Sequence, residues 1–240
     1  MKRDQTMVVV ILGLVLFLAI SQRVITPQTL LLFGVAVPSI ILHEVSHGVA
    51  ALGFGDDTAK QAGRVTLNPV RHIDVFGTIV LPALLALSGL GVFGYAKPVP
   101  INPGRMRRPR DDAVLTSLAG PATNIILALL AGLWLRQQHA GVWVRQMLLG
   151  FIAMDNIPWR LRIPVAFGIV NVVLAVFNLI PIPPLDGSSV IERFLPKGWQ
   201  SAWDKIRRFG MLILIALVLL RPGLLGRVFL PALRLWARVA

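Results

Sequence analysis

Long apolar segments recur along this chain and limit it to a membrane fold. A helix needs about 20 apolar residues, with a range of about 17–25, to cross the hydrocarbon layer of a bilayer. Six segments approach that length: residues 7–24, 29–54, 75–95, 113–135, 163–180 and 209–220, the last lengthened at its start by 203–208. Only 15% of the residues are charged, against about a quarter in soluble domains. We therefore expect an all-α polytopic membrane protein, with residues 1–240 forming one unit in the lipid bilayer.

One of the six segments and the tail that follows the last of them differ from ordinary spanning helices. Glycine and proline interrupt residues 75–95 several times, and irregular backbone is tolerated at membrane depth only where protein or a water-filled cavity surrounds it. The tail after Pro222 carries arginines among leucine, phenylalanine and tryptophan, which favours an amphipathic helix lying in the interface. The sequence thus predicts about five to six transmembrane helices plus a re-entrant or broken segment at 75–95.

The net charge of +13 does not indicate a nucleic-acid-binding protein. The basic residues lie beside the apolar segments, as in the cluster at residues 105–110, and they accompany no nucleic-acid-binding motif. Cationic loops of this kind face anionic headgroups on the cytoplasmic side. We expect a multi-pass protein of a prokaryotic cell membrane with no nucleic-acid partner. The chain contains no cysteine, which excludes disulfides and thiolate metal ligands.

The sequence HEVSH at residues 43–47 places three ionisable side chains inside the second apolar segment. Such residues cost several kcal/mol each in a membrane span unless they are paired, so they indicate a functional site. On a helix, His43 and His47 lie on one face and can bind one metal ion, and Glu44 can act on a nearby water molecule as a general base. The alternative is a polar cluster packed against neighbouring helices.

A catalytic zinc needs three protein ligands and one open position, so a third ligand must come from elsewhere in the chain. Asp186 is the strongest candidate, because it follows the fifth apolar segment in the stretch NLIPIPPLDG at residues 178–187. The prolines end the preceding helix, and Gly187 permits a tight turn behind the carboxylate. An equally weighted alternative is that Asp186 caps the helix that follows.

These motifs together resemble the site-2 protease family of intramembrane zinc metalloproteases. The similarity rests on HEVSH, on GPATN at residues 120–124 and on NLIPIPPLDG, and it covers about residues 29–191. The sequence is similar to the compact branch that has no PDZ-like or CBS-like extension. The resemblance implies a catalytic core at residues 29–191, with residues 1–28 and 192–240 as peripheral helices.

The resemblance also implies a set of roles. One Zn2+ ion would be held by His43, His47 and Asp186, Glu44 would be the catalytic base, and the substrates would be single-span membrane proteins. Asn124 and Asn178 are candidate contacts to the substrate backbone or the oxyanion. For both amides the alternative is an interhelical hydrogen bond.

A parity argument predicts the topology. His43 and His47 lie towards the C-terminal end of one helix, and Asp186 follows the C-terminal end of another. If the three residues reach one ion, the two helices must run in the same direction. Either one of the two intervening apolar segments does not cross, or a short extra crossing lies near residues 147–154. We expect residues 75–95 to enter and leave on one side.

The competing functional class is a non-catalytic metal-binding membrane protein or a transporter. A transporter should show further ionisable residues along a path on both sides of the midplane, whereas here they concentrate at one depth and include Glu44. His72 and Asp74 form a weaker candidate for a second metal site, for which we favour interfacial hydrogen bonding. The sequence therefore favours an intramembrane zinc metalloprotease.

Overall fold

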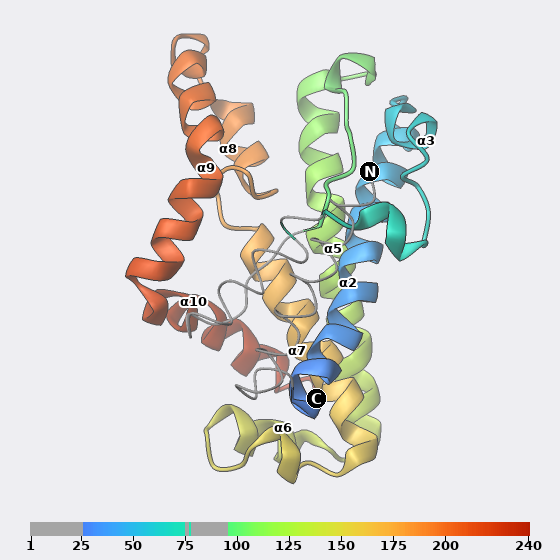
Figure 1. The fold of residues 1–240 in the computed structure, drawn as a ribbon, viewed down its shortest axis with the longest axis vertical. Coiled ribbons are helices and arrows are strands. Elements are labelled where there is room, and N and C mark those ends of the chain that lie inside the picture. Colours follow the sequence, from blue (N-terminus) through green and yellow to red (C-terminus); the bar gives the residue numbers. More distant parts are fainter. Residues whose placement is uncertain (1–25, 75–76, 78–95) are drawn as a thin grey trace, which may run out of the picture.

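The computed structural model describes residues 26–74, 77 and 96–240 (Figure 1). The first apolar segment and almost all of residues 75–95 lie outside this part, so the structure does not test the predictions made for them. The described residues form eight α-helices and no strand. The all-α prediction is confirmed for these residues.

Three long helices correspond to the second, fourth and fifth apolar segments. They are α2 (Pro27–Gly53), α5 (Pro109–Gln137) and α7 (Trp159–Asn178), and each is long and apolar enough to cross a membrane. Proline stands at or just before the first helical position of each, where its missing N–H removes no helical hydrogen bond. In the most apolar 18-residue stretch of each helix, only 22% of α2, 28% of α5 and 39% of α7 is buried. These helices therefore expose apolar side chains, as lipid-facing helices do.

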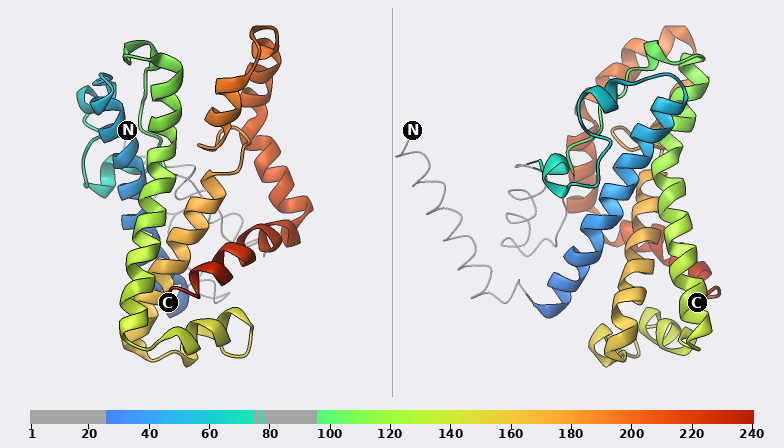
Figure 2. Two further views of the ribbon diagram at one scale, coloured as in Figure 1. Left: turned by 180° about the vertical axis from the view of Figure 1, so that it is seen from behind. Right: turned by 90° about the vertical axis from the view of Figure 1, so that its right-hand side faces the viewer.

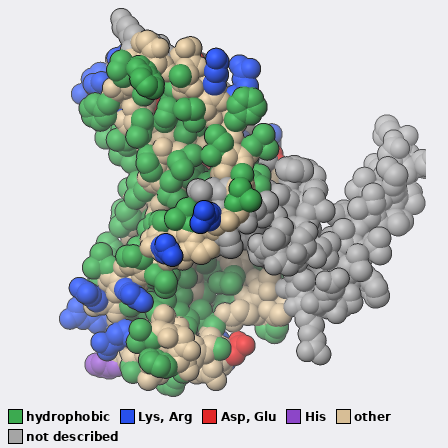
Figure 3. Space-filling model, turned by 90° about the vertical axis from the view of Figure 1, so that its left-hand side faces the viewer, with side chains coloured by type: hydrophobic (Ala, Val, Ile, Leu, Met, Phe, Trp, Pro, Cys, Tyr) green, Lys and Arg blue, Asp and Glu red, His purple; other side chains and the backbone are tan. Residues whose placement is uncertain are grey.

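The surface of the protein agrees with this interpretation. The exposed large apolar residues of α5 include Ile126, Leu130 and Leu133. Figure 3 shows one face of the protein, on which hydrophobic side chains cover much of the surface and Lys and Arg side chains gather in separate groups. A multi-pass membrane protein presents such a surface to lipid and headgroups.

Helices α2 and α7 run in the same direction, and α5, which comes between them in the sequence, runs in the opposite direction (Figures 1 and 2). The end of α2 and the start of α5 therefore lie at the same end of the protein. The chain between them begins and finishes at that end, as the parity argument predicts. The course of residues 75–95 within this connection lies outside the described residues.

Shorter elements join and flank the three long helices. Near the end of α2 and the start of α5 lie α3 (Thr58–Gln61) and the 3-10 turns η1 (Pro69–His72) and η3 (Pro103–Arg105). The connection from α5 to α7 holds α6 (Gly141–Leu148) and η4 (Met154–Asn156), and α6 is too short to cross a bilayer. After α7 come α8 (Ser188–Phe194), η5 (Lys197–Trp199), α9 (Gln200–Leu220) and α10 (Pro222–Trp236).

The apolar core lies where α5, α6, α7 and α10 meet. Leu135, Val144 and Val165 are fully buried there, and Trp236 of α10 is 4% exposed. The Trp236 indole N–H donates to the carbonyl of Ala128 at 2.7 Å. The tail after Pro222 is helical, as the sequence predicts, but its C-terminal turn packs into the core, a contact that the amphipathic pattern alone does not reveal.

Candidate metal centre

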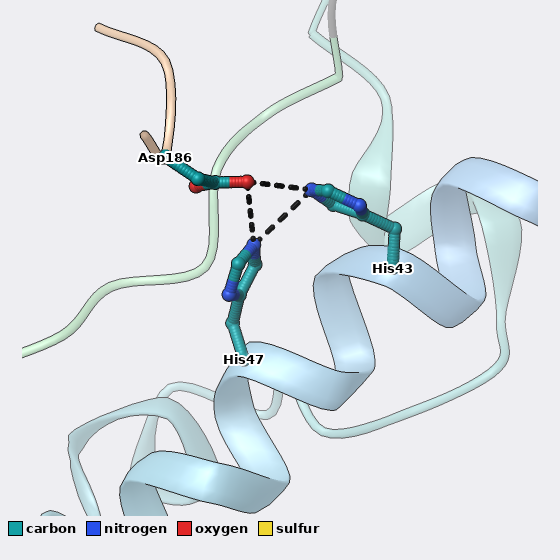
Figure 4. A group of neighbouring side chains, drawn as sticks. All are labelled: His43, His47 and Asp186. Atoms are coloured by element: carbon teal, nitrogen blue, oxygen red, sulfur yellow. Dashed lines mark hydrogen bonds and ion pairs between the residues drawn. The ribbon is translucent and has the colours of Figure 1, made fainter. Parts of the chain in front are cut away.

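Helix α2 places His43 and His47 one turn apart on the same face, and both side chains are buried. Asp186 arrives from the segment after α7 and points at both rings (Figure 4). Its Oδ2 atom lies 3.2 Å from the Nε2 of His43 and 3.4 Å from the Nε2 of His47. The two Nε2 atoms are 3.1 Å apart. The three sequence-predicted ligands thus form a nearly equilateral triangle.

The hydrogen bonds of the two imidazoles fix their tautomers. The Nδ1 of His47 lies 2.7 Å from the carbonyl oxygen of Thr116, and the Nδ1 of His43 lies 2.6 Å from the amide oxygen of Asn124. Both oxygens only accept hydrogen bonds, so each Nδ1 must carry the proton and donate. In the neutral imidazoles each Nε2 therefore directs a lone pair at the Oδ2 of Asp186. Three electron-rich atoms at this separation repel one another unless a metal ion or a proton lies between them.

A chain of buried hydrogen bonds sets the orientation of Asn124. Its Nδ2 donates to the Oδ1 of Asn171 at 2.7 Å, and the Nδ2 of Asn171 donates to Ser39 and to the carbonyl of Phe167, each at 2.9 Å. The Ser39 hydroxyl in turn donates to the carbonyl of Val35. Because each link has a fixed direction, the amide oxygen of Asn124 must face His43. The chain joins α2, α5 and α7 behind the metal centre.

Gly120 leaves the space that the two imidazoles occupy. A Cβ atom at this position would lie 2.5 Å from the Nε2 of His47 and 2.6 Å from the Nε2 of His43. Real Cβ contacts essentially never come closer than 3.0 Å, and here the obstructing atoms are two rings held by hydrogen bonds. Two residues of the GPATN motif therefore serve the site: Gly120 leaves space for the imidazoles because it has no side chain, and Asn124 accepts a hydrogen bond from His43.

The backbone around Asp186 rejects the helix-capping alternative. Gly187 occupies the N-cap position of α8 and no side chain caps that helix, while the Asp186 carboxylate turns to the histidines. The Gly187 N–H donates to the carbonyl of Asn178 at 2.7 Å. A Cβ on Gly187 would overlap the backbone of Leu179. The backbone φ of Gly187 is an ordinary −59°, so the glycine is needed for close approach and not for an unusual conformation.

Glu44 lies in the same cavity as the triangle. The cavity has a volume of about 330 Å3 and is lined by residues of α2, α5, α7 and α9 and of the segments around Val99 and Leu185, among them Ile40, Phe177 and Met211. One carboxylate oxygen of Glu44 accepts a hydrogen bond from the backbone N–H of Val99 at 2.9 Å. The predicted base is thus held by a backbone donor beside the predicted metal ligands.

The donor set fits a zinc ion. Zinc bonds of roughly 2.0–2.2 Å in tetrahedral geometry place neighbouring ligand atoms about 3.3–3.5 Å apart, close to the observed 3.1, 3.2 and 3.4 Å. The Oδ2 of Asp186 is buried and accepts no hydrogen bond from the described residues, which fits an atom that binds a metal ion. His43, His47 and Asp186 are the one cluster of this kind within the described part of the chain.

The other polar residues that the sequence singled out, Asn124, Asn178 and His72, have different surroundings in the structure. Asn124 has no exposure and holds His43, so its position favours orienting a ligand over contacting a substrate. Asn178 lines the cavity and donates to the carbonyl of Leu174, which leaves a substrate contact open to it. His72 is buried and its Nε2 lies 2.8 Å from the carbonyl of Thr66, in line with a hydrogen-bonding role.

Comparison with known proteins supports the same assignment. "Putative zinc metalloprotease YwhC" of Bacillus subtilis is 38% identical over 181 residues, which cover 75% of this chain and 76% of the relative. The family description "Peptidase family M50" matches residues 144–220, a range that includes Asp186. This chain belongs to peptidase family M50. The resemblance to the site-2 protease family is thereby confirmed.

Two further M50 relatives carry the name "Putative zinc metalloprotease Rip2". The protein of Mycolicibacterium smegmatis is 34% identical over 192 residues, covering 78% of this M50 chain and 65% of the relative. That of Mycobacterium tuberculosis is 32% identical over 196 residues, covering 80% and 67%. No solved structure was found to match the chain.

Proposed function

We propose that this M50 peptidase is an intramembrane zinc metalloprotease that cleaves single-span membrane proteins within or near their transmembrane segments. The observation that carries the proposal is the convergence of His43, His47 and Asp186 on one point beside Glu44, in a cavity lined by residues of α2, α5, α7 and α9. We assign residues 29–191 as the catalytic core and His43, His47 and Asp186 as the ligands of one Zn2+ ion.

Zinc held by these residues would supply Lewis acidity, which lowers the pKa of a water molecule to about 7 and polarises a carbonyl group. Glu44 accepts the proton of the attacking water as the water oxygen bonds to the carbonyl carbon of the substrate. Glu44 then delivers that proton to the leaving nitrogen as the carbon–nitrogen bond breaks. The hydrogen bond from the Val99 N–H leaves the second carboxylate oxygen of Glu44 for this proton transfer.

The substrate must be locally unwound, because a membrane helix keeps its backbone groups hydrogen-bonded internally. An unwound segment needs backbone partners, and an exposed edge of extended backbone can supply them. We propose that the glycine-rich residues 75–95 offer such an edge and that Asn178 contacts the substrate backbone from α7. The apolar cavity lining from Ile40, Phe177 and Met211 suits the side chains of a transmembrane segment.

Substitution of Glu44 tests this function. In detergent-solubilised protein, Glu44→Gln should retain one equivalent of zinc and lose cleavage of a single-span test substrate. Asp186→Ala, measured beside it, should lose both zinc and cleavage. Cleavage that persists in Glu44→Gln at the wild-type rate would refute the assignment of the base. A wild-type protein that binds zinc and cleaves no membrane substrate would support the alternative of a non-catalytic metal-binding protein or transporter.

We also propose five to six transmembrane helices, with residues 75–95 leaving and returning on the cytoplasmic side. The support is that α2 ends and α5 begins at the same end of the protein. The chain has no cysteine, so a Gly104→Cys variant carries one thiol that can be labelled with membrane-impermeant reagents. We expect labelling from the cytoplasmic side, and labelling from the external side alone would refute this topology.

A further inference from the structure

The segment that binds Glu44 is held by a buried arginine outside the catalytic site. Gly63, with a φ of +62°, follows α3 and turns the chain before Arg64. Arg64 is 7% exposed, and its Nη2 donates to two consecutive carbonyls, those of Lys97 and Pro98, at 3.3 Å each. No carboxylate of the described residues forms an ion pair with Arg64. A buried guanidinium that binds only carbonyls holds backbone in place and neutralises no acid.

A buried carboxylate holds the other end of the same segment. Asp56 has no exposure, and its Oδ2 accepts the backbone N–H of Asn102 at 2.6 Å. Its Oδ1 accepts the hydroxyl and the N–H of Thr58. Burial on its own would raise the pKa of Asp56, but the hydrogen bonds from Thr58 and Asn102 outweigh burial and lower the pKa below its ordinary value. Asp56 therefore stays ionised at neutral pH and keeps both sets of bonds.

Between these two anchors lies the amide that reaches Glu44. Pro98 and Pro100 have no N–H, so Val99 provides the one backbone donor of this tripeptide. The Val99 side chain is 6% exposed, and it packs beside Gly48, the residue after His47. A shift of the segment would carry the Val99 N–H away from the Glu44 carboxylate.

We propose that Arg64 is a positioning residue for Glu44, acting through the carbonyls of Lys97 and Pro98 and the amide of Val99. This inference rests on the proposed function, in which Glu44 is the base. Arg64 is neither part of the ligand triangle nor a lining residue of the cavity, and it reaches the cavity lining only through the carbonyl of Pro98. Its loss should therefore impair the chemical step and spare zinc binding and substrate affinity.

The test compares Arg64→Gln with Arg64→Lys and with Arg71→Gln, which removes an exposed cation from the neighbouring η1 turn. For Arg64→Gln we expect kcat to fall about tenfold to a hundredfold, as for a small misplacement of a catalytic group, with unchanged KM and one equivalent of zinc. Arg64→Lys should recover most of kcat, because an ammonium group also donates to carbonyls. Arg71→Gln should match the wild type.

A second measurement is independent of activity. The Val99 amide, read by hydrogen exchange in protein carrying 15N-valine, should exchange at least about tenfold faster in Arg64→Gln than in the wild type. In a double-mutant cycle, Val99→Pro and Arg64→Gln should each lower kcat. The double variant should lower it little further, because both changes remove the same hydrogen bond between the Val99 N–H and Glu44.

Several results would overturn the inference: an unchanged kcat, a loss of zinc, or additive effects in the cycle. If Arg64→Gln does not fold, Arg64→Lys decides, since its kcat and its Val99 exchange rate must then change together. A wild type without activity would instead refute the proposed function, and the exchange rates would still test whether Arg64 holds the Val99 amide.

Discussion

The three long helices meet in two regions that are built differently. Around Trp236 they are joined by apolar packing, with Leu135 and Val165 fully buried and with one indole hydrogen bond. Around the metal centre they are joined by a directional chain of hydrogen bonds through Asn124 and Asn171. Apolar packing is non-directional and tolerates small shifts, whereas each bond of the chain dictates the next. The comparison teaches that one region maintains the fold and the other maintains the geometry of two imidazoles.

In each region a glycine stands where another side chain comes closest to a helix backbone: Gly120 beside the imidazoles and Gly168 beside Trp236. An alanine at one glycine should therefore disturb one region and leave the other intact. Gly120→Ala places a methyl group 2.5–2.6 Å from the ligand nitrogens, and we expect zinc binding and proteolysis to be abolished while the helices remain folded. Zinc content by elemental analysis and helicity by circular dichroism check this. Gly34→Ala in α2, where nothing lies within 4 Å, is the matched control and should keep zinc. A zinc-loaded Gly120→Ala would contradict the assigned ligand geometry.

Gly168→Ala should have the opposite effect to Gly120→Ala, lowering the stability of the fold and leaving zinc binding intact. Its Cβ would overlap the Trp236 ring, and overpacking of this kind costs about 1–3 kcal/mol. We expect a lower Tm with full zinc content in the folded fraction, measured by thermal unfolding and elemental analysis. The double variant Gly168→Ala with Trp236→Leu should unfold at a higher temperature than Gly168→Ala alone. If Gly168→Ala released zinc without lowering Tm, the two regions would not be separate.

Asn171→Leu tests the hydrogen-bond chain behind the metal centre, and of the three variants it should have the smallest effect. It removes the partner of the Asn124 Nδ2 and of Ser39, so the amide oxygen of Asn124 is no longer fixed towards His43. Loss of such an outer partner typically weakens metal binding about 10–100-fold. Competition with a zinc chelator measures this change, and Asn171→Gln, which keeps an amide, should recover part of the affinity. An unchanged zinc affinity would show that Asn171 serves packing alone.

The sequence predicted the ligand triangle because each of its members carries a local signal. His43 and His47 are one helical turn apart in an apolar segment, and Asp186 stands beside prolines that stop a helix. The common direction of α2 and α7 followed from the requirement that both reach one ion. The structure brings the three side chains together and runs α2 and α7 in one direction, while the ligand roles, the first apolar segment and residues 75–95 stay predictions.

The sequence did not predict the groups that hold the triangle. Thr116 acts through its backbone carbonyl, which any residue possesses, and Asn171 resembles an ordinary interhelical amide until its partners are known. Arg64 and Trp236 are set apart by burial, and burial depends on contacts far along the chain. Such contacts leave no periodicity or spacing for a single sequence to reveal.

The empty space at Gly120 has a consequence for telling active relatives from inactive ones. Every other amino acid carries at least a Cβ, so a homologue can keep HExxH and the distant aspartate and still be unable to load its metal if this glycine is replaced. We therefore expect the residue at this position to distinguish relatives that can bind the metal from relatives that keep the chemical groups of the site and cannot bind it.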